Sequence, residues 1–302
     1  NEEKHASFES RRRFVAQLGM AIAAVPFASF LYGVTRGKYA FTVHHNIVDY
    51  PDLPKAFDGL RILQISDIHS GSFDSMAAVA RGVEMIQAQK ADIILFTGDL
   101  VNSHAYEIEP YIHLFKALHA PMGKFSVLGN HDYGHYRDED ERGIENMAAL
   151  QGHHASMGFR LLNNENLFLE KEGEKIRLVG VENWGKSKHF PKKGDLDKAF
   201  EGVDAEEFCI LMSHDPSHWE AKILDFPKKV QLTLSGHTHG MQLGVEIPGM
   251  KWSPSKYLYP QWAGLYERED QKIYVNRGFG FLGFPGRVGI LPEITILELR
   301  KA

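Results

Sequence analysis

The chain has 302 residues, of which 43% are hydrophobic and 24% charged, and its formal net charge at pH 7 is −5. These proportions are typical of a globular protein and exclude a disordered one, and the length allows one large domain or two ordinary ones. The acidic balance argues against a general nucleic-acid-binding protein, because such proteins need a basic face to neutralise phosphates, so no nucleic acid is expected as a partner.

The amino-terminal part of the chain predicts a membrane anchor. Residues 1–13 form a basic tail that is polar and unstructured over residues 1–10 and ends in three consecutive arginines. Residues 14–34 contain one strongly polar residue, Gln17, and as a helix rising about 1.5 Å per residue they would span a bilayer core. The alternative is an amphipathic or core helix of the globular domain.

The arginines Arg11, Arg12 and Arg13 indicate how this anchor or signal-anchor helix is oriented. Basic residues stay on the cytoplasmic side of a membrane, so we expect an extracytoplasmic catalytic domain, with the cytoplasmic face of the membrane as the alternative. Residues 10–15 also resemble a twin-arginine export signal, which would carry an already folded domain across the membrane.

Residues 35–59 predict a linker with a lead-in strand, and residues 60–302 predict one catalytic domain. Apolar runs of strand length alternate here with amphipathic helices, as in an α/β fold. The only cysteine, Cys209, lies in one such run, where we expect a small buried hydrophobe. Strands are predicted at residues 61–66, 92–97, 124–128, 160–162, 167–171, 176–181, 208–213, 230–235, 272–276 and 293–299, and helices at 75–90, 106–119 and 138–157.

Residues of metal-ligand type follow five of these predicted strands. They are Asp67, His69, Asp99, Asn130, His131, His214, His237 and His239. Because α/β folds build their sites at strand ends, we expect these side chains to converge. A donor set of carboxylates, an amide oxygen and imidazoles suits manganese, iron or zinc rather than calcium.

This donor set predicts a centre of two divalent or trivalent metal ions. One carboxylate could bridge two ions held roughly 3.5–4 Å apart, and such a pair stabilises the attacking and leaving oxygens of a displacement at phosphorus. We therefore expect the hydrolysis of a phosphodiester or pyrophosphate bond by metal-bound hydroxide.

The same residues make the chain resemble the calcineurin-like metallophosphoesterase superfamily over residues 60–302. The resemblance rests on five motifs in family order: Asp67-x-His69, Gly98-Asp99, Gly129-Asn130-His131-Asp132, His214 and Gly236-His237-Thr238-His239. It implies a four-layer α-β-β-α sandwich of two mixed sheets flanked by helices, here behind an amino-terminal membrane helix.

The resemblance also implies a role for each motif residue. One ion would be held by Asp67, His69, Asp99 and His239, and the other by Asp99, Asn130, His214 and His237. Asp99 would bridge the ions. His131 would protonate the leaving oxygen or stabilise the phosphate, and Asp132 would orient the His131 ring.

A narrower resemblance concerns the end of the chain. The end of the chain resembles a membrane-associated or exported phosphohydrolase branch in Arg277-Gly278-Phe279-Gly280, Pro285, Arg287 and Pro292-Glu293-Ile294, together with the anchor. That branch is similar to enzymes that cleave the pyrophosphate of UDP-2,3-diacylglucosamine. This implies a phosphate-containing small molecule or lipid as substrate. Met241 departs from the branch pattern, which has glycine there, so the identity of the substrate is not determined. We expect the Met241 thioether to narrow the substrate entrance or make it more apolar.

Other residues allow two interpretations each. Arg287 would clamp a phosphate or lie unpaired on the surface, Trp184 would line the cleft or belong to an ordinary loop, and Asp215 would support a ligand or, as we prefer, cap a helix. The aromatic side chains of residues 252–262 and 279–284 would form an exposed patch for a lipid substrate or pack as a satellite core.

Four other functions compete with this hypothesis. A nucleotide phosphodiesterase or a protein phosphatase would use the same metals with a different cleft. A helical His-Asp phosphohydrolase is disfavoured because His131-Asp132 and His214-Asp215 follow strand-like runs. A non-catalytic metal-binding scaffold would have lost ligands, whereas every ligand position here is filled.

Overall fold

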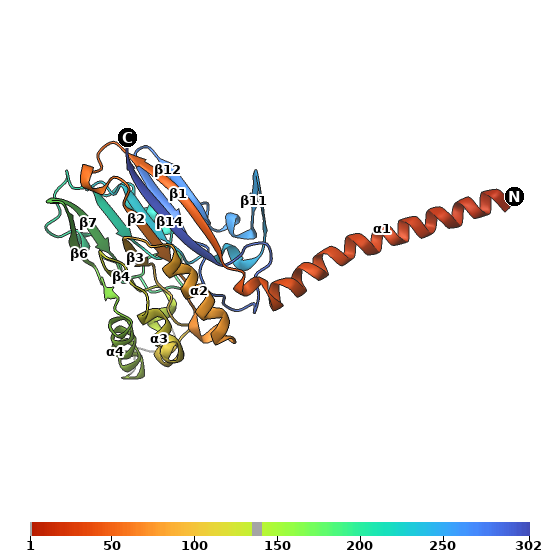
Figure 1. Cartoon of the computed structure of the whole chain (residues 1–302), viewed down its shortest axis with the longest axis horizontal. Coiled ribbons are helices and arrows are strands. Elements are labelled where there is room, and N and C mark those ends of the chain that lie inside the picture. The colour runs from red at the N-terminus through yellow and green to blue at the C-terminus, as the bar shows by residue number, and fades with distance from the viewer. Residues whose placement is uncertain (1, 135–140) are drawn as a thin grey trace.

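The computed structural model describes residues 2–134 and 141–302 of the chain. Helix α1 (Glu2–Thr35) stands away from the domain as one long rod (Figure 1). It begins at Glu2, so residues 2–10, which the sequence analysis expects to be unstructured, are helical. Its 25-residue segment Arg11–Thr35 is long and apolar enough to cross a membrane and is not buried in the domain, so the alternative of a core helix is wrong.

Two six-stranded mixed sheets form the domain, as predicted. The first has the order β1 (Thr42–Tyr50), β14 (Glu293–Lys301), β2 (Arg61–Ile65), β3 (Ile93–Phe96), β4 (Lys124–Ser126) and β5 (Arg160–Leu161), and only the β14–β2 pair is antiparallel. The second has the order β12 (Gly264–Arg268), β13 (Gln271–Val275), β9 (Leu232–Ser235), β8 (Cys209–Met212), β7 (Glu174–Gly180) and β6 (Glu165–Lys171). In the second sheet the two outer pairs are antiparallel and the inner ones parallel.

The two sheets pack face to face, and helices cover their outer faces. Side chains alternate across each strand, so Ile62 of β2 packs between the sheets while Leu63 and Ile65 face the helices. Helices α2 (Met76–Ala88), α3 (Ile112–Lys116) and α4 (Glu141–Ser156) cover the first sheet (Figure 1), and α5 (Leu196–Ala199) with the π-helical turn Trp219–Ile223 covers the second. These layers are the expected α-β-β-α sandwich, and Cys209 is buried as expected.

Some predicted elements differ in the structure. The helix expected at residues 106–119 is a 3-10 helix, Ala105–Tyr111, followed by the short α3, because Pro110 offers no backbone N–H for an α-helical turn. The predicted start of the next helix at residue 138 lies outside the described residues. Strand β12 and the hairpin of β10 (Val245–Ile247) and β11 (Met250–Trp252) were not predicted.

The sheet topology places the motifs at one edge of the molecule. Strands β2, β3 and β4 are parallel, as are β8 and β9 in the other sheet, so the carboxyl ends within each set lie together. Hydrogen bonds join the two sets: Gln64 donates to the carbonyl oxygen of Ser235 over 2.9 Å, and the His214 Nδ1 atom lies 2.7 Å from the Thr97 carbonyl oxygen. Loops from both sheets therefore meet over one site.

Candidate metal centre

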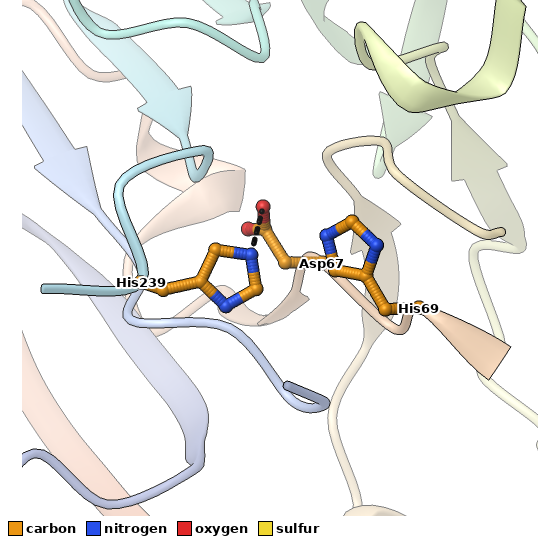
Figure 2. Close-up of side chains that lie close together, drawn as sticks. All are labelled: Asp67, His69 and His239. Carbon is orange, nitrogen blue, oxygen red and sulfur yellow. Dashed lines mark ion pairs between the residues drawn. The ribbon is translucent and has the colours of Figure 1, made fainter. Parts of the chain in front are cut away.

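The predicted ligand residues converge in two groups. Asp67, His69 and His239 form the first group, and Figure 2 shows their side chains facing one another. Within it the His239 Nε2 atom lies 3.3 Å from the Asp67 Oδ1 atom. Asp99, His214 and His237 form the second group, and in each group the ligand atoms lie within 4.8 Å of one another.

Asp99 lies between the two groups. Its Oδ2 atom is 3.5 Å from the His69 Nε2 atom and 3.1 Å from the His214 Nε2 atom. The Asn130 amide oxygen belongs with the second group, because it lies 3.2 Å from His214 Nε2 and 2.7 Å from His237 Nδ1. This placement agrees with the ligand sets that the family resemblance implies.

The histidines are oriented as metal ligands usually are. A carbonyl oxygen can only accept, so His214 donates Nδ1–H to Thr97 and presents Nε2 to the site. His69 makes the corresponding contact, with Nδ1 3.1 Å from the Asn102 side-chain oxygen, and its buried Nε2 atom has no hydrogen-bond partner among the described residues. The sequence analysis did not single out Asn102, which no motif marks.

Backbone strain is concentrated at the ligands. Among the described residues, eleven non-glycine residues have positive φ, and five of them are Asp67, His69, Asp99, His237 and His239. Each such residue costs on the order of 1–3 kcal/mol, and strain of this kind persists at functional sites because the surrounding structure enforces it. A β-carbon at Gly98 would lie 2.5 Å from the Gly129 backbone nitrogen, so the close crossing of these two loops requires glycine.

The electrostatics of the site favour a cation. Burial lowers the pKa of His69 to about 3 and also lowers the pKa of His237. Burial alone would lower the pKa of His214, but the adjacent Asp99 carboxylate outweighs it and raises that pKa to about 10. Burial would raise the pKa of both Asp67 and Asp99, yet the surrounding imidazoles lower both. Buried ionised carboxylates beside imidazole lone pairs fit bound metal ions, which would displace the proton of His214.

His131 and Asp132 share a loop but make different contacts. The His131 Nδ1 atom lies 2.8 Å from the Asn102 carbonyl oxygen, so the orienting contact expected from Asp132 comes from Asn102. The buried Asp132 carboxylate instead accepts hydrogen bonds from the backbone N–H groups of Asp99 (2.9 Å), Leu100 (2.8 Å) and Gly129 (2.8 Å). Asp132 thereby ties the loop that follows β3 to the loop that follows β4.

A cavity of about 200 Å³ opens over the site. His131, Asp99 and the two His-x-His residues line it together with a largely apolar set, Phe190, Met241, Tyr259 and Leu282. The expectation that Met241 borders the entrance agrees with this position. The Tyr259 hydroxyl lies 2.8 Å from His237 Nε2, which leaves His237 Nδ1 beside Asn130. Only the tertiary structure brings Phe190 and Leu282 to the site, because both lie in loops without a motif.

Arg287 is fully buried, so neither interpretation of it agrees with the structure. Its guanidinium donates to the carbonyl oxygens of Gly280 and Arg277, each over 2.8 Å, and its Nη2 atom lies 3.1 Å from His239 Nδ1. With its donors turned to the backbone, it cannot clamp a substrate phosphate. Arg287 positions the loop and the ring of His239.

The other two uncertain residues make different contacts. Trp184 does not line the cavity; it packs beside His218, and its ring centre lies 4.6 Å from the Lys222 ammonium. The Asp215 Oδ1 atom accepts a hydrogen bond from the backbone of Ser217 over 2.8 Å, which is the preferred capping role, and its Oδ2 atom lies 3.6 Å from His237 Nε2, so Asp215 also contacts a predicted ligand.

The aromatic loops divide between core and surface. Phe279 and Phe281 are buried, and Phe281 packs edge-on against Tyr39. Phe284 and Tyr257 are exposed, by 38% and 73% respectively. The expectation of one exposed patch containing both Phe281 and Phe284 is therefore wrong.

Comparisons with known proteins agree with the fold and the motifs. Residues 60–241 match the family model "Calcineurin-like phosphoesterase", and residues 3–38 match "Probable Calcineurin-like phosphoesterase, transmembrane domain". The uncharacterised metallophosphoesterase YkuE of Bacillus subtilis is 30% identical over 97% of this chain and 98% of its own. The UDP-2,3-diacylglucosamine pyrophosphatase LpxG of Chlamydia trachomatis is 30% identical over 76% of this chain and 81% of its own.

Two further proteins are less similar to this chain. A transmembrane protein with metallophosphoesterase domain from Danio rerio is 29% identical over all of this chain, which spans 65% of that protein. Among solved structures, the sulfate thiohydrolase SoxB of Thermus thermophilus is 13% identical with a TM-score of 0.45, over 82% of this chain and 58% of its own.

Proposed function

The chain belongs to the calcineurin-like phosphoesterase family, and from this premise we propose that it hydrolyses a phosphodiester or pyrophosphate bond at a two-metal centre. Family membership makes it a hydrolase of phosphoric esters. The observation that carries the two-metal proposal is the position of Asp99, whose one carboxylate oxygen faces His69 of the first group and His214 of the second.

The residues present fit two ions. Asp67, His69 and His239 would hold one, Asn130, His214 and His237 the other, and Asp99 both; imidazole and carboxylate donors suit manganese, iron or zinc. Bound there, the ions would neutralise charge on the phosphoryl oxygens and lower the pKa of a water at the site.

His131 supplies the proton chemistry in this proposal. It lines the cavity, and its Nδ1–H is committed to the Asn102 carbonyl oxygen, so the proton that moves is the one on Nε2. From that atom the ring would hydrogen-bond the phosphoryl group and give a proton to the leaving oxygen. Phe190, Met241 and Leu282 restrict water around the reacting atoms.

The lining of the cavity supports a substrate with an apolar part. Apolar side chains line the cavity together with the metal ligands, and one relative is named a UDP-2,3-diacylglucosamine pyrophosphatase. We infer a phosphate-containing lipid or small molecule as substrate. The protein is anchored in the membrane through α1. We place its catalytic domain on the extracytoplasmic side, because Arg11, Arg12 and Arg13 precede the membrane segment.

The test uses the full chain in detergent, with metal content and turnover of a chromogenic phosphodiester measured together. Asp99→Asn should lose most of the turnover and lower the metal bound per chain, because the bridging oxygen serves both groups. Asp204→Asn, at an exposed position remote from the cavity, is the matched control and should keep both. Unchanged metal and turnover in Asp99→Asn would refute the bridge, whereas metal without turnover on any phosphate ester in the unaltered protein would favour a scaffold.

A further inference from the structure

Exposed apolar side chains are concentrated in one part of the domain. Among the described side chains outside α1, twelve large hydrophobic residues are exposed, and eight of them fall within residues 241–284. The eight are Met241, Leu243, Val245, Ile247, Met250, Tyr257, Leu258 and Phe284. A concentration of this kind marks an interaction surface rather than scattered surface residues.

The hairpin β10–β11 turns its apolar face away from the domain. Its register pairs Val245 with Trp252 and Ile247 with Met250, so these four side chains share one face and Glu246 and Lys251 share the other. In a hairpin that packs on a water-soluble domain, the apolar face would be the inner one. Here Ile247 and Met250 are 57% and 51% exposed.

Polar contacts fix this inverted orientation. On the inner face the Glu246 carboxylate lies 2.6 Å from the Arg277 guanidinium. The Lys251 ammonium donates to the Ala263 carbonyl oxygen and lies 5.3 Å from the centre of the Trp262 ring. The apolar face is thus held outward by contacts that a rotated hairpin would lose.

The same surface adjoins the membrane anchor. Phe284 packs edge-on against Phe30 of α1, with ring centres 6.0 Å apart, and the Arg287 backbone N–H donates to the Gly33 carbonyl oxygen over 3.1 Å. The next residue, Val288, forms a β-bridge with Leu243, directly before the hairpin. Figure 1 shows β11 on the side of the domain where α1 joins it.

These contacts set the height of the surface relative to a bilayer. The membrane-spanning segment ends at Thr35, and Phe30 precedes that end by five residues, which is about 7.5 Å of helix rise. A side chain that packs on Phe30 therefore reaches the boundary of the hydrocarbon region. Elements that lie in the membrane interface bury their apolar faces by a similar depth, about 5–10 Å.

We propose that the outer face of the hairpin β10–β11, together with Tyr257, Leu258 and Phe284, lies in the membrane interface beside α1. The partner is the phospholipid surface itself. Lys256, which follows the hairpin, and Arg36, which follows the anchor, are exposed and place cations at the level of the lipid phosphates.

This seating brings the cavity to the membrane. Met241 and Leu282 line the cavity, and the side chain of Gln242 joins them to the membrane-facing loop, since it donates to the Phe284 carbonyl oxygen over 2.9 Å and accepts from Leu282 N–H over 2.6 Å. A lipid phosphate would enter from the bilayer surface without crossing water. This consequence rests on the proposed function, whereas the seating of the hairpin does not.

The seating is tested by labelling the full chain in phospholipid vesicles. Ile247→Cys and the matched control Ile47→Cys each place a fluorophore on a strand residue, 57% and 65% exposed respectively, and the native Cys209 is buried. Ile47 lies five residues beyond the start of β1 at Thr42, which is about 17 Å along the strand. Lipids carrying a nitroxide just below the headgroup should quench the Ile247 label about threefold or more over the Ile47 label, because of the 5–10 Å depth.

Two results would overturn the seating. Equal weak quenching of both labels would place the hairpin in water. A label at Ile247 that is shielded from aqueous iodide without quenching by the lipid would show that protein, such as a second copy of the chain, covers the face. Neither result depends on catalysis, so failure here differs from failure of the proposed function.

A second measurement joins the seating to the substrate. Ile247→Asp should leave turnover of a soluble chromogenic phosphodiester unchanged and lower severalfold the turnover of a phosphate ester carried by a vesicle lipid. Ile47→Asp, which puts the same charge on another exposed isoleucine, should change neither. Equal turnover of the vesicle substrate by both variants would refute access from the membrane.

Discussion

Replacing Asp132 by asparagine should destabilise the domain more than it alters the chemistry. The buried carboxylate accepts four backbone hydrogen bonds, with Leu100 and Val101 on one oxygen and Asp99 and Gly129 on the other. Asparagine has the same shape but only one acceptor oxygen, so its amide group faces two buried N–H donors. Burial and the adjacent Asp99 carboxylate raise the pKa of Asp132 to about 7, so the effect is measured above that pH, where Asp132 is ionised. At about 1.5–3 kcal/mol for each hydrogen bond to a charged group, the loss is then about 3–6 kcal/mol.

Urea unfolding of the metal-free chain in detergent measures this loss. All four tryptophans, Trp184, Trp219, Trp252 and Trp262, belong to the domain and none to α1, so their fluorescence reports the domain alone. With a slope of about 3 kcal/mol per molar urea, the midpoint should fall by about 1–2 M. Metal affinity should fall as well, because the two tied loops carry Asp99 and Asn130.

The control is His131→Asn, which removes one side-chain hydrogen bond between the same loops, from His131 to the Asn102 carbonyl oxygen, where Asp132 accepts four. Its midpoint should fall less than that of Asp132→Asn while its turnover falls. If Asp132→Asn instead kept its unfolding midpoint and metal and lost turnover as His131→Asn does, Asp132 would act through the His131 ring, and the reasoning from backbone hydrogen bonds would be refuted.

Further predictions concern three side chains. His131→Asn should keep its metal and lose about 10²–10⁴-fold in kcat, less for esters with good leaving groups; an equal loss across leaving groups would contradict proton donation. Burial lowers the pKa of His154 to about 3 from about 6.5 in the unfolded chain, so the folded state resists protonation and stability falls as pH drops through that interval. Between pH 6.5 and 5 the neutral His154 should lower the free energy of unfolding by about 2 kcal/mol, and His154→Gln should abolish this pH dependence. Urea midpoints of His154→Gln that fall with pH as steeply as those of the unaltered chain would contradict this. Arg287→Lys should lower the free energy of unfolding by about 2–6 kcal/mol, because buried carbonyl oxygens lose their donors. The same change should weaken metal binding through His239. An unaltered metal affinity in calorimetric titration would contradict this second effect.

The local pattern of the sequence determined the identity and the edge of the site. Apolar runs of strand length each end in a ligand-type residue, and parallel strands of one sheet align their carboxyl ends, so the approach of Asp67 to Asp99 follows from periodicity and topology. His214 follows a strand of the other sheet and reaches them through the packing of the two sheets. Burial on both faces explains why these short runs form strands, and the long apolar run at the amino terminus was predicted for a similarly local reason.

Only the tertiary structure decided what supports the ligands. Asn102 contacts both His69 and His131, yet its position is marked by nothing in the sequence, because the contacts come from loops about thirty residues apart. Arg287 follows a Pro-Gly turn that is typical of the surface, but the crossing of its loop with residues 277–280 buries it.

The hairpin β10–β11 shows most clearly what the sequence alone does not predict. Alternation along Val245–Ile247 and Met250–Trp252 reveals two faces, but a period of two residues does not say which face turns inward. The Glu246–Arg277 ion pair makes that choice, and the two residues lie 31 positions apart in the chain. Local residues determined the chemistry of this protein, whereas long-range contacts decided which of its surfaces faces the membrane anchor.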